Sequence, residues 1–124
     1  MQVKQKLPRL IKKPWGWELV FAHTERYVGK VLHVTKGHRL SRQYHEVKEE
    51  TLMVLSGKVT LELGVGKAMK RKSLGPHRQF HLPPRTVHRM IAETDCELVE
   101  VSTPELDDVV RLEDSYGRSG TRAP

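Results

Sequence analysis

The chain has 124 residues and a formal net charge of +7, and this length suits a single domain. Hydrophobic residues make up 37% of it, which excludes a wholly disordered chain. No stretch approaches the roughly 20 apolar residues of a membrane-spanning helix, and the single cysteine cannot form an internal disulfide. We therefore expect a cytoplasmic protein with no membrane contact.

Positive charge gathers in two segments of the sequence. The first contains Lys4, Lys6, Arg9, Lys12 and Lys13, and the second contains Lys67, Lys70, Arg71 and Lys72. Neither segment interleaves its cations with the aromatic residues on which single-stranded nucleic acids stack, so nucleic acid is not the expected partner. Solvated loops, edge strands or a site for an anionic small molecule explain the charge instead. Residues 1–12 are accordingly expected to form a basic arm or an edge strand.

Short segments with β-strand composition follow one another at a spacing of about 8–12 residues, with turn residues between them, which is typical of a sandwich or barrel. The expected strands are 17–22, 27–34, 43–45, 51–56, 58–63, 79–82, 88–92 and 97–101. A short helix is expected near the C-terminus, because Thr103 can cap it and Pro104 suits its first position. Val109, Val110 and Leu112 would dock that helix on the core. The sequence therefore predicts an all-β domain with one short C-terminal helix.

Amide, imidazole and carboxylate side chains are spaced so that they can meet around one metal ion. Gln43 and His45 are two residues apart, so on a strand they project from the same face. Glu50 begins the next strand after a short turn, and His88 follows a turn stiffened by two prolines. Such a ligand set suits one divalent transition metal, and Zn, Mn, Co, Ni and Fe all remain possible. The alternative is that the two histidines only pack in the core.

The spacing of these residues resembles the first motif of the cupin superfamily, with Gln43 where many cupins have a histidine. The second cupin motif is matched at Pro83 and His88. It is not matched at three positions, which are His77, Arg85 and Ala92.

Three further segments are similar to the C-terminal cupin domain of type II mannose-6-phosphate isomerases, and they are Lys13–Glu18, Gly37–His45 and Val110–Arg118. In bacteria that domain is usually fused to a mannose-1-phosphate guanylyltransferase, for which this sequence has no counterpart. The resemblance implies a jelly-roll β-sandwich over residues 13–118. Residues 119–124 are expected to form a flexible tail. It also implies that the metal is held inside the barrel by Gln43, His45, Glu50 and His88.

The implied activity is the interconversion of mannose 6-phosphate and fructose 6-phosphate through an enediol. This reaction needs an acid or base that moves a proton between C1 and C2, and a metal to hold the sugar oxygens. The candidates for proton transfer are Lys30, His33, His81 and Glu100. Lys30 and His33 lie on opposite faces of one strand, so at most one of them points inward unless a bulge intervenes, and Lys30, His81 and Glu100 are the preferred set. The candidates for binding the sugar phosphate are Arg39, Ser41 and Arg118, since an arginine fork suits phosphate.

Two other function classes remain open, because small cupins carry many chemistries. One is a redox cupin such as an iron dioxygenase, which the amide of Gln43 disfavours. The other is a non-catalytic cupin that binds a sugar or a sugar nucleotide. A homodimer is the expected assembly, and the N-terminal arm could add a strand to a neighbour's sheet.

Overall fold

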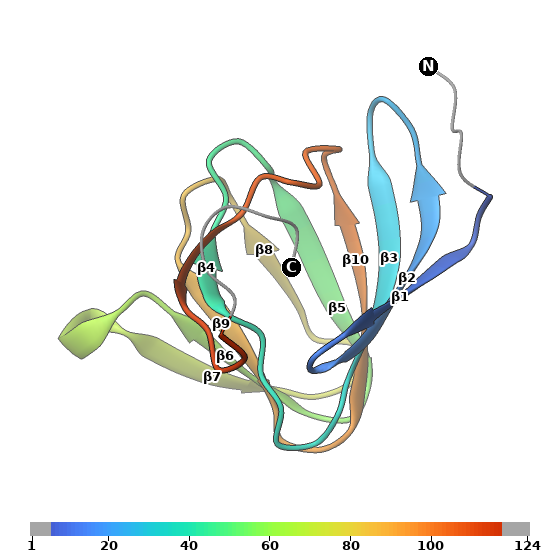
Figure 1. Ribbon diagram of the computed structural model, residues 1–124. Coiled ribbons are helices and arrows are strands. Elements are labelled where there is room, and N and C mark those ends of the chain that lie inside the picture. Colours follow the sequence, from blue (N-terminus) through green and yellow to red (C-terminus); the bar gives the residue numbers. More distant parts are fainter. Residues whose placement is uncertain (1–5, 118–124) are drawn as a thin grey trace.

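A computed structural model of the chain describes residues 6–117, which fold into two antiparallel sheets that face each other (Figure 1). The six-stranded sheet has the order β1-β2-β3-β10-β5-β8. In that order its strands are Arg9–Lys13, Gly16–His23, Val28–Val34, Cys96–Ser102, Glu50–Ser56 and Gln79–Leu82. The five-stranded sheet has the order β11-β4-β9-β6-β7. In that order its strands are Val110–Glu113, Arg42–Tyr44, His88–Ala92, Val59–Leu63 and Lys70–Leu74. The predicted all-β sandwich is confirmed.

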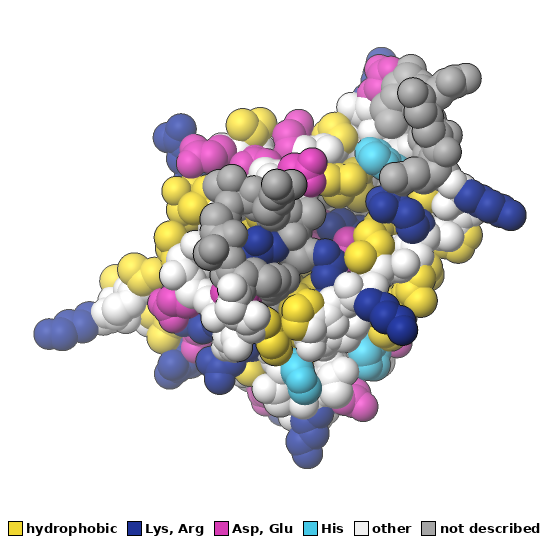
Figure 2. Space-filling view, in the orientation of Figure 1, with side chains coloured by type: hydrophobic (Ala, Val, Ile, Leu, Met, Phe, Trp, Pro, Cys, Tyr) yellow, Lys and Arg dark blue, Asp and Glu magenta, His cyan; other side chains and the backbone are white. Residues whose placement is uncertain are grey.

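The space between the sheets is apolar at one end and polar at the other. Along β10 the buried side chains change from Cys96 and Leu98 to Glu100 and Ser102. The apolar end is closed by residues such as Trp15, which is fully buried. Because alternate residues of a strand face the same side, this gradient follows directly from the sequence of the strand. In Figure 1 the polar end is at the top, where β10 ends and β5 begins, and Figure 2 shows Lys and Arg side chains in dark blue spread over the face turned to the viewer.

The eight predicted strands are present, with ends that differ by at most one residue, and three strands are additional. β1 lies at the edge of its sheet and pairs only with β2 within residues 6–117. β7 pairs with β6 at the other sheet's edge. β7 was not predicted because its basic residues give no alternation of apolar and polar positions, and an edge strand can be exposed on both faces.

The helix predicted after Thr103 is wrong. Residues 103–109 form turns that cross the polar end from β10 to β11, and Val110–Glu113 pairs with β4 as strand β11 (Figure 1). The capping signals at Thr103 and Pro104 are outweighed by long-range contacts, above all those of Asp108, whose carboxylate accepts backbone hydrogen bonds from the β4–β5 turn. The tail predicted at 119–124 lies outside the described residues. Within residues 6–117 no helix has the length and apolar character to span a membrane.

Candidate metal centre

Three of the predicted metal ligands meet at the polar end of the sandwich. One ligand atom from each of His45, Glu50 and His88 lies within 4.8 Å of the others, and all three residues are buried. His45 directly follows β4, whereas Glu50 and His88 are the first residues of β5 and β9. The His45 Nε2 atom lies 2.7 Å from Glu50 Oε2. Start positions of strands from both sheets therefore converge on one point.

Gln43, the fourth predicted ligand, lies on the strand next to that of His88. It pairs in register with His88 across β4 and β9 and is 2% exposed. Its Oε1 atom is buried and has no hydrogen-bond partner within residues 6–117. A buried amide oxygen without a partner is costly, and a cation beside it would remove that cost. The residues present therefore fit a divalent transition metal held by two ring nitrogens, one carboxylate and one amide oxygen.

Both imidazoles are oriented for metal binding by backbone carbonyls. The Nδ1 atom of His45 contacts the carbonyl oxygen of Asp108, and that of His88 lies 2.9 Å from the carbonyl oxygen of Thr86. A carbonyl accepts only, so each Nδ1 carries the proton and each Nε2 keeps its lone pair. The tautomers that the contacts impose are thus those that leave Nε2 free to bind a cation.

The charges around the ligands keep them in their metal-binding forms. Burial acts to raise the pKa of the Glu50 carboxyl, but the nearby Lys48 ammonium holds it well below its usual range. Burial lowers the pKa of His88, which favours its neutral imidazole. Glu50 is thus ionised and His88 neutral near pH 7.

A chain of buried ion pairs leads from Glu50 across the inside of the six-stranded sheet. Lys48 Nζ lies 3.7 Å from Glu50 Oε2 and 3.3 Å from Glu100 Oε2. Lys30 Nζ lies 3.9 Å from the same Glu100 oxygen and 3.4 Å from Glu18 Oε2. All five residues are buried. An isolated buried charge is strongly unfavourable, so the alternation of sign along this chain is what allows a polar interior.

Lys48 and Glu18 are site residues that sequence reasoning missed. Lys48 lies in the turn between His45 and Glu50, where a lysine is ordinarily exposed to solvent, yet it is 2% exposed. Its neighbours Glu100 and Glu50 raise its pKa, although burial opposes them. The sequence signal for Glu18 is the alternation of inward and outward residues along β2, which places Glu18 on the buried face. The same alternation along β10 places Glu100 on the buried face.

Some of the remaining predicted site residues face the interior of the sandwich, and others do not. Lys30 and Glu100 face the interior as expected, and Ser41 is fully buried. Arg39 is exposed on the surface and does not join the site. His81 also fails to join it, because it lies on the outer face of β8, with a 48% exposed side chain that pairs with Glu49 at 2.6 Å. Arg118 lies outside the described residues.

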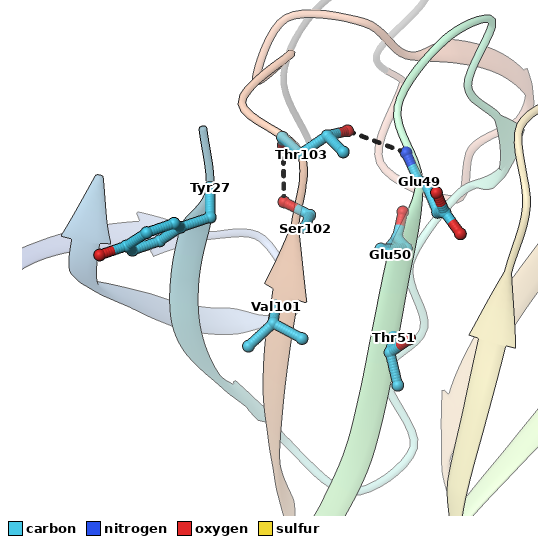
Figure 3. A pocket seen from close by; sticks show the side chains of 7 residues that line it. All are labelled: Tyr27, Glu49, Glu50, Thr51, Val101, Ser102 and Thr103. Atoms are coloured by element: carbon cyan, nitrogen blue, oxygen red, sulfur yellow. Dashed lines mark hydrogen bonds between the residues drawn. The ribbon is translucent and has the colours of Figure 1, made fainter. Parts of the chain in front are cut away.

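A shallow hollow of about 260 Å³ lies near the start of β5 and the end of β10 (Figure 3). Tyr27, Thr51 and Val101 line it, and a hydrogen bond from the Glu49 amide to the Thr103 hydroxyl closes one end. The hollow does not contain either histidine of the metal centre. Glu50, one of the predicted metal ligands, also lines the hollow, which therefore borders the candidate metal centre on that side.

Comparison with known proteins agrees with this arrangement. A family model described as mannose-6-phosphate isomerase C-terminal matches residues 2–114. Mannose-1-phosphate guanylyltransferase ManC of Salmonella typhimurium is 33% identical over 115 residues, which cover 89% of this chain and 23% of the relative. The chain thus spans about a quarter of the length of the curated relatives that it matches.

Solved structures with a similar fold have lower sequence identity. The capsular polysaccharide assembling protein CapF from Staphylococcus aureus has a TM-score of 0.74 and 18% identity, over 85% of this chain and 34% of that one. An RmlC-like cupin from Shewanella frigidimarina has a TM-score of 0.68 and 16% identity, over 79% of this chain and 85% of that one. The fold is therefore the predicted cupin fold. Since the family model matches nearly the whole described chain, the protein belongs to the mannose-6-phosphate isomerase C-terminal family.

Proposed function

We propose that this chain is a metal-dependent sugar-phosphate isomerase of carbohydrate metabolism that interconverts mannose 6-phosphate and fructose 6-phosphate. The observation that carries the proposal is the buried convergence of Gln43, His45, Glu50 and His88 beside the ion pairs of Lys48, Glu100 and Lys30. The family's description and the sugar-phosphate chemistry in the name of ManC support it. When bound, a divalent metal supplies Lewis-acid polarisation of the sugar oxygens.

Glu100 is the residue that we assign to proton transfer. Its carboxylate lies between two ammonium groups, at 3.3 Å from Lys48 and 3.9 Å from Lys30. A carboxylate can accept the proton that leaves C2 of mannose 6-phosphate and return it to C1, while the proton of the O2 hydroxyl moves to O1. The ammonium groups of Lys30 and Lys48 donate hydrogen bonds to oxygens that carry negative charge during this transfer. His81 has no part in this step.

The proposal is tested by a coupled assay for fructose 6-phosphate formed from mannose 6-phosphate, with each candidate metal supplied in turn. The His45→Ala, His88→Ala double variant is expected to lose at least about a thousandfold in kcat/KM, because it removes both ring nitrogens of the site. Chelator treatment should do the same to the unmodified chain. His81→Ala is the matched control, and its activity should stay within about twofold of the unmodified chain, because His81 lies outside the site.

Absence of turnover in metal-replete protein would contradict the isomerase. Tight binding of a sugar or sugar nucleotide without turnover would then indicate a non-catalytic cupin. Oxygen uptake with bound ferrous iron would indicate a redox cupin instead.

We also propose that the chain forms a homodimer through the outer face of the six-stranded sheet. An apolar row crosses that face from strand to strand, in the registered order Leu10, Leu19, Val31, Val99 and Met53. Beside it, Phe21 is 46% exposed and Val101 is 54% exposed. Contiguous apolar surface of this kind is typical of interaction sites, and a two-fold dimer buries the same patch on both copies.

Phe21→Glu is expected to give a monomer in light scattering coupled to gel filtration, because the dimer would bury two unpaired carboxylates. Leu112→Glu is the matched control: Leu112 is 47% exposed, but it lies in β11 of the other sheet. A monomeric unmodified chain, or a Phe21→Glu variant that stays dimeric, would show that this face is not the interface.

A further inference from the structure

A second hollow, of about 140 Å³, lies between the first three strands and the crossing segment that follows β10. Its lining residues are Arg9, Ile11, Lys13, Glu18, Val20, Lys30, Leu106 and Asp107. Its lining is rich in charged side chains, which suits either a separate ligand or one part of the substrate.

The register of the strands shows that the basic residues of β1 face the interior. Arg9 pairs with Val20, which pairs with Lys30, which pairs with Glu100. Directly paired residues of neighbouring strands project to the same face of a sheet, and Val20, Lys30 and Glu100 are buried inside. Arg9 and Lys13 share that face, whereas Lys12 between them is exposed on the outer face opposite Trp17.

The charges that line the hollow favour an anion that also has hydroxyl groups. Three cationic side chains face two carboxylates, and Glu18 is already paired with Lys30 at 3.4 Å. The Nε atom of Arg9 is buried and has no hydrogen-bond partner within residues 6–117. A guanidinium presents several N–H donors in a plane and suits the oxygens of a phosphate. The carboxylate of Asp107 can accept hydrogen bonds from hydroxyl groups.

The hollow lies within a small molecule's reach of the metal centre. Lys30 is common to the wall of the hollow and to the ion-pair chain. Three successive contacts of 3.9, 3.3 and 3.7 Å lead from Lys30 through Glu100 and Lys48 to Glu50. A hexose whose C1 and C2 oxygens lie beside Glu50 thus extends its far end toward Arg9.

We propose that this hollow is the phosphate subsite, with Arg9 as the principal ligand of the phosphate and Lys13 as the second cation. This inference rests on the proposed isomerase function for the identity of the substrate, but its anion chemistry does not. It assigns a role to the inward half of the basic N-terminal segment, and it replaces Arg39, whose exposed side chain lies away from the site.

The test compares the full-length chain with Arg9→Gln and, as the matched control, Lys12→Gln. Both variants lose one positive charge from β1, but only Arg9 faces the hollow. Calorimetric titration with inorganic phosphate is done with EDTA present, so that no metal ion can bind the anion. The unmodified chain and Lys12→Gln should bind phosphate alike, and Arg9→Gln should bind it at least about tenfold more weakly, as expected for a lost charge-assisted hydrogen bond.

A kinetic measurement complements the titration. Arg9→Gln should raise the KM for mannose 6-phosphate by about tenfold or more and leave kcat within about twofold, because the phosphate is bound equally in the ground state and in the transition state. Arg9→Lys keeps the charge without the planar fork, so its KM should lie between those of the unmodified chain and Arg9→Gln.

The outcomes separate this inference from the isomerase. If all forms lack turnover but the difference in phosphate binding persists, the subsite stands and the isomerase does not. Phosphate binding that is absent from the unmodified chain, or equal in all forms, would overturn the subsite even if the chain isomerises the sugar.

Discussion

Glu50→Gln is expected to lower the affinity for a divalent metal by at least about a hundredfold and to abolish turnover. The substitution keeps the shape of the side chain but removes the single anionic ligand of the set, whose charge balances a divalent cation. It also removes one of the two ion pairs that Lys48 makes within residues 6–117 and leaves the pair with Glu100 at 3.3 Å. Competition for the metal with a chromophoric chelator measures the change in affinity.

The neighbouring residue provides the control for this substitution. Glu49→Gln removes the same charge one position earlier, but the Glu49 carboxylate is exposed and pairs with His81 on the outer face. Its metal affinity should stay within about twofold of the unmodified chain, because a solvent-exposed charge is well screened. Equal affinities of the two variants would show that Glu50 does not bind the metal.

The positions of the candidate metal ligands could be predicted because each of them is marked by a local signal in the sequence. Gln43 and His45 are two residues apart, and Glu50 and His88 each begin a strand after a turn. Such short-range relations survive small errors in strand ends: β4 ends at Tyr44, so that His45 already belongs to the turn. The expected convergence of the four side chains did not depend on that detail.

The contacts that support the ligands could not be predicted in the same way. Asp108 accepts hydrogen bonds from the β4–β5 turn, which lies about sixty positions earlier in the sequence. The same hydrogen bonds favour the observed crossing segment over the predicted helix. His81 shows the reverse error. It was expected to face the cavity, but Phe80 and Leu82 are the buried residues of β8, so His81 points outward. The parity of β8 depends on its pairing with β5, which the sequence does not reveal.

Asp108→Ala is expected to destabilise the fold by about 2 kcal/mol and to weaken metal binding by about tenfold. The Asp108 carboxylate accepts hydrogen bonds from the amides of Glu46, Val47 and Lys48, and its backbone carbonyl faces His45 Nδ1. Only Lys48 of the three donor residues is buried, so water can replace two of the lost bonds and the cost stays near that of one unsatisfied donor. Chemical unfolding measures it.

The pH dependence of this difference identifies its cause. Burial acts to raise the pKa of Asp108, but the amide hydrogen bonds from Lys48, Val47 and Glu46 hold it below its ordinary value of 3.8. The ionised carboxylate therefore contributes its stability fully above pH 3.8, and this contribution is lost as the pH falls through the lower folded-state pKa. The gap between Asp108→Ala and the unmodified chain should be constant near pH 7 and should shrink in acid. Asp107→Ala removes the adjacent exposed carboxylate and should show no such gap. A gap that is independent of pH down to full protonation would mean that Asp108 acts through its packing and not through its charge.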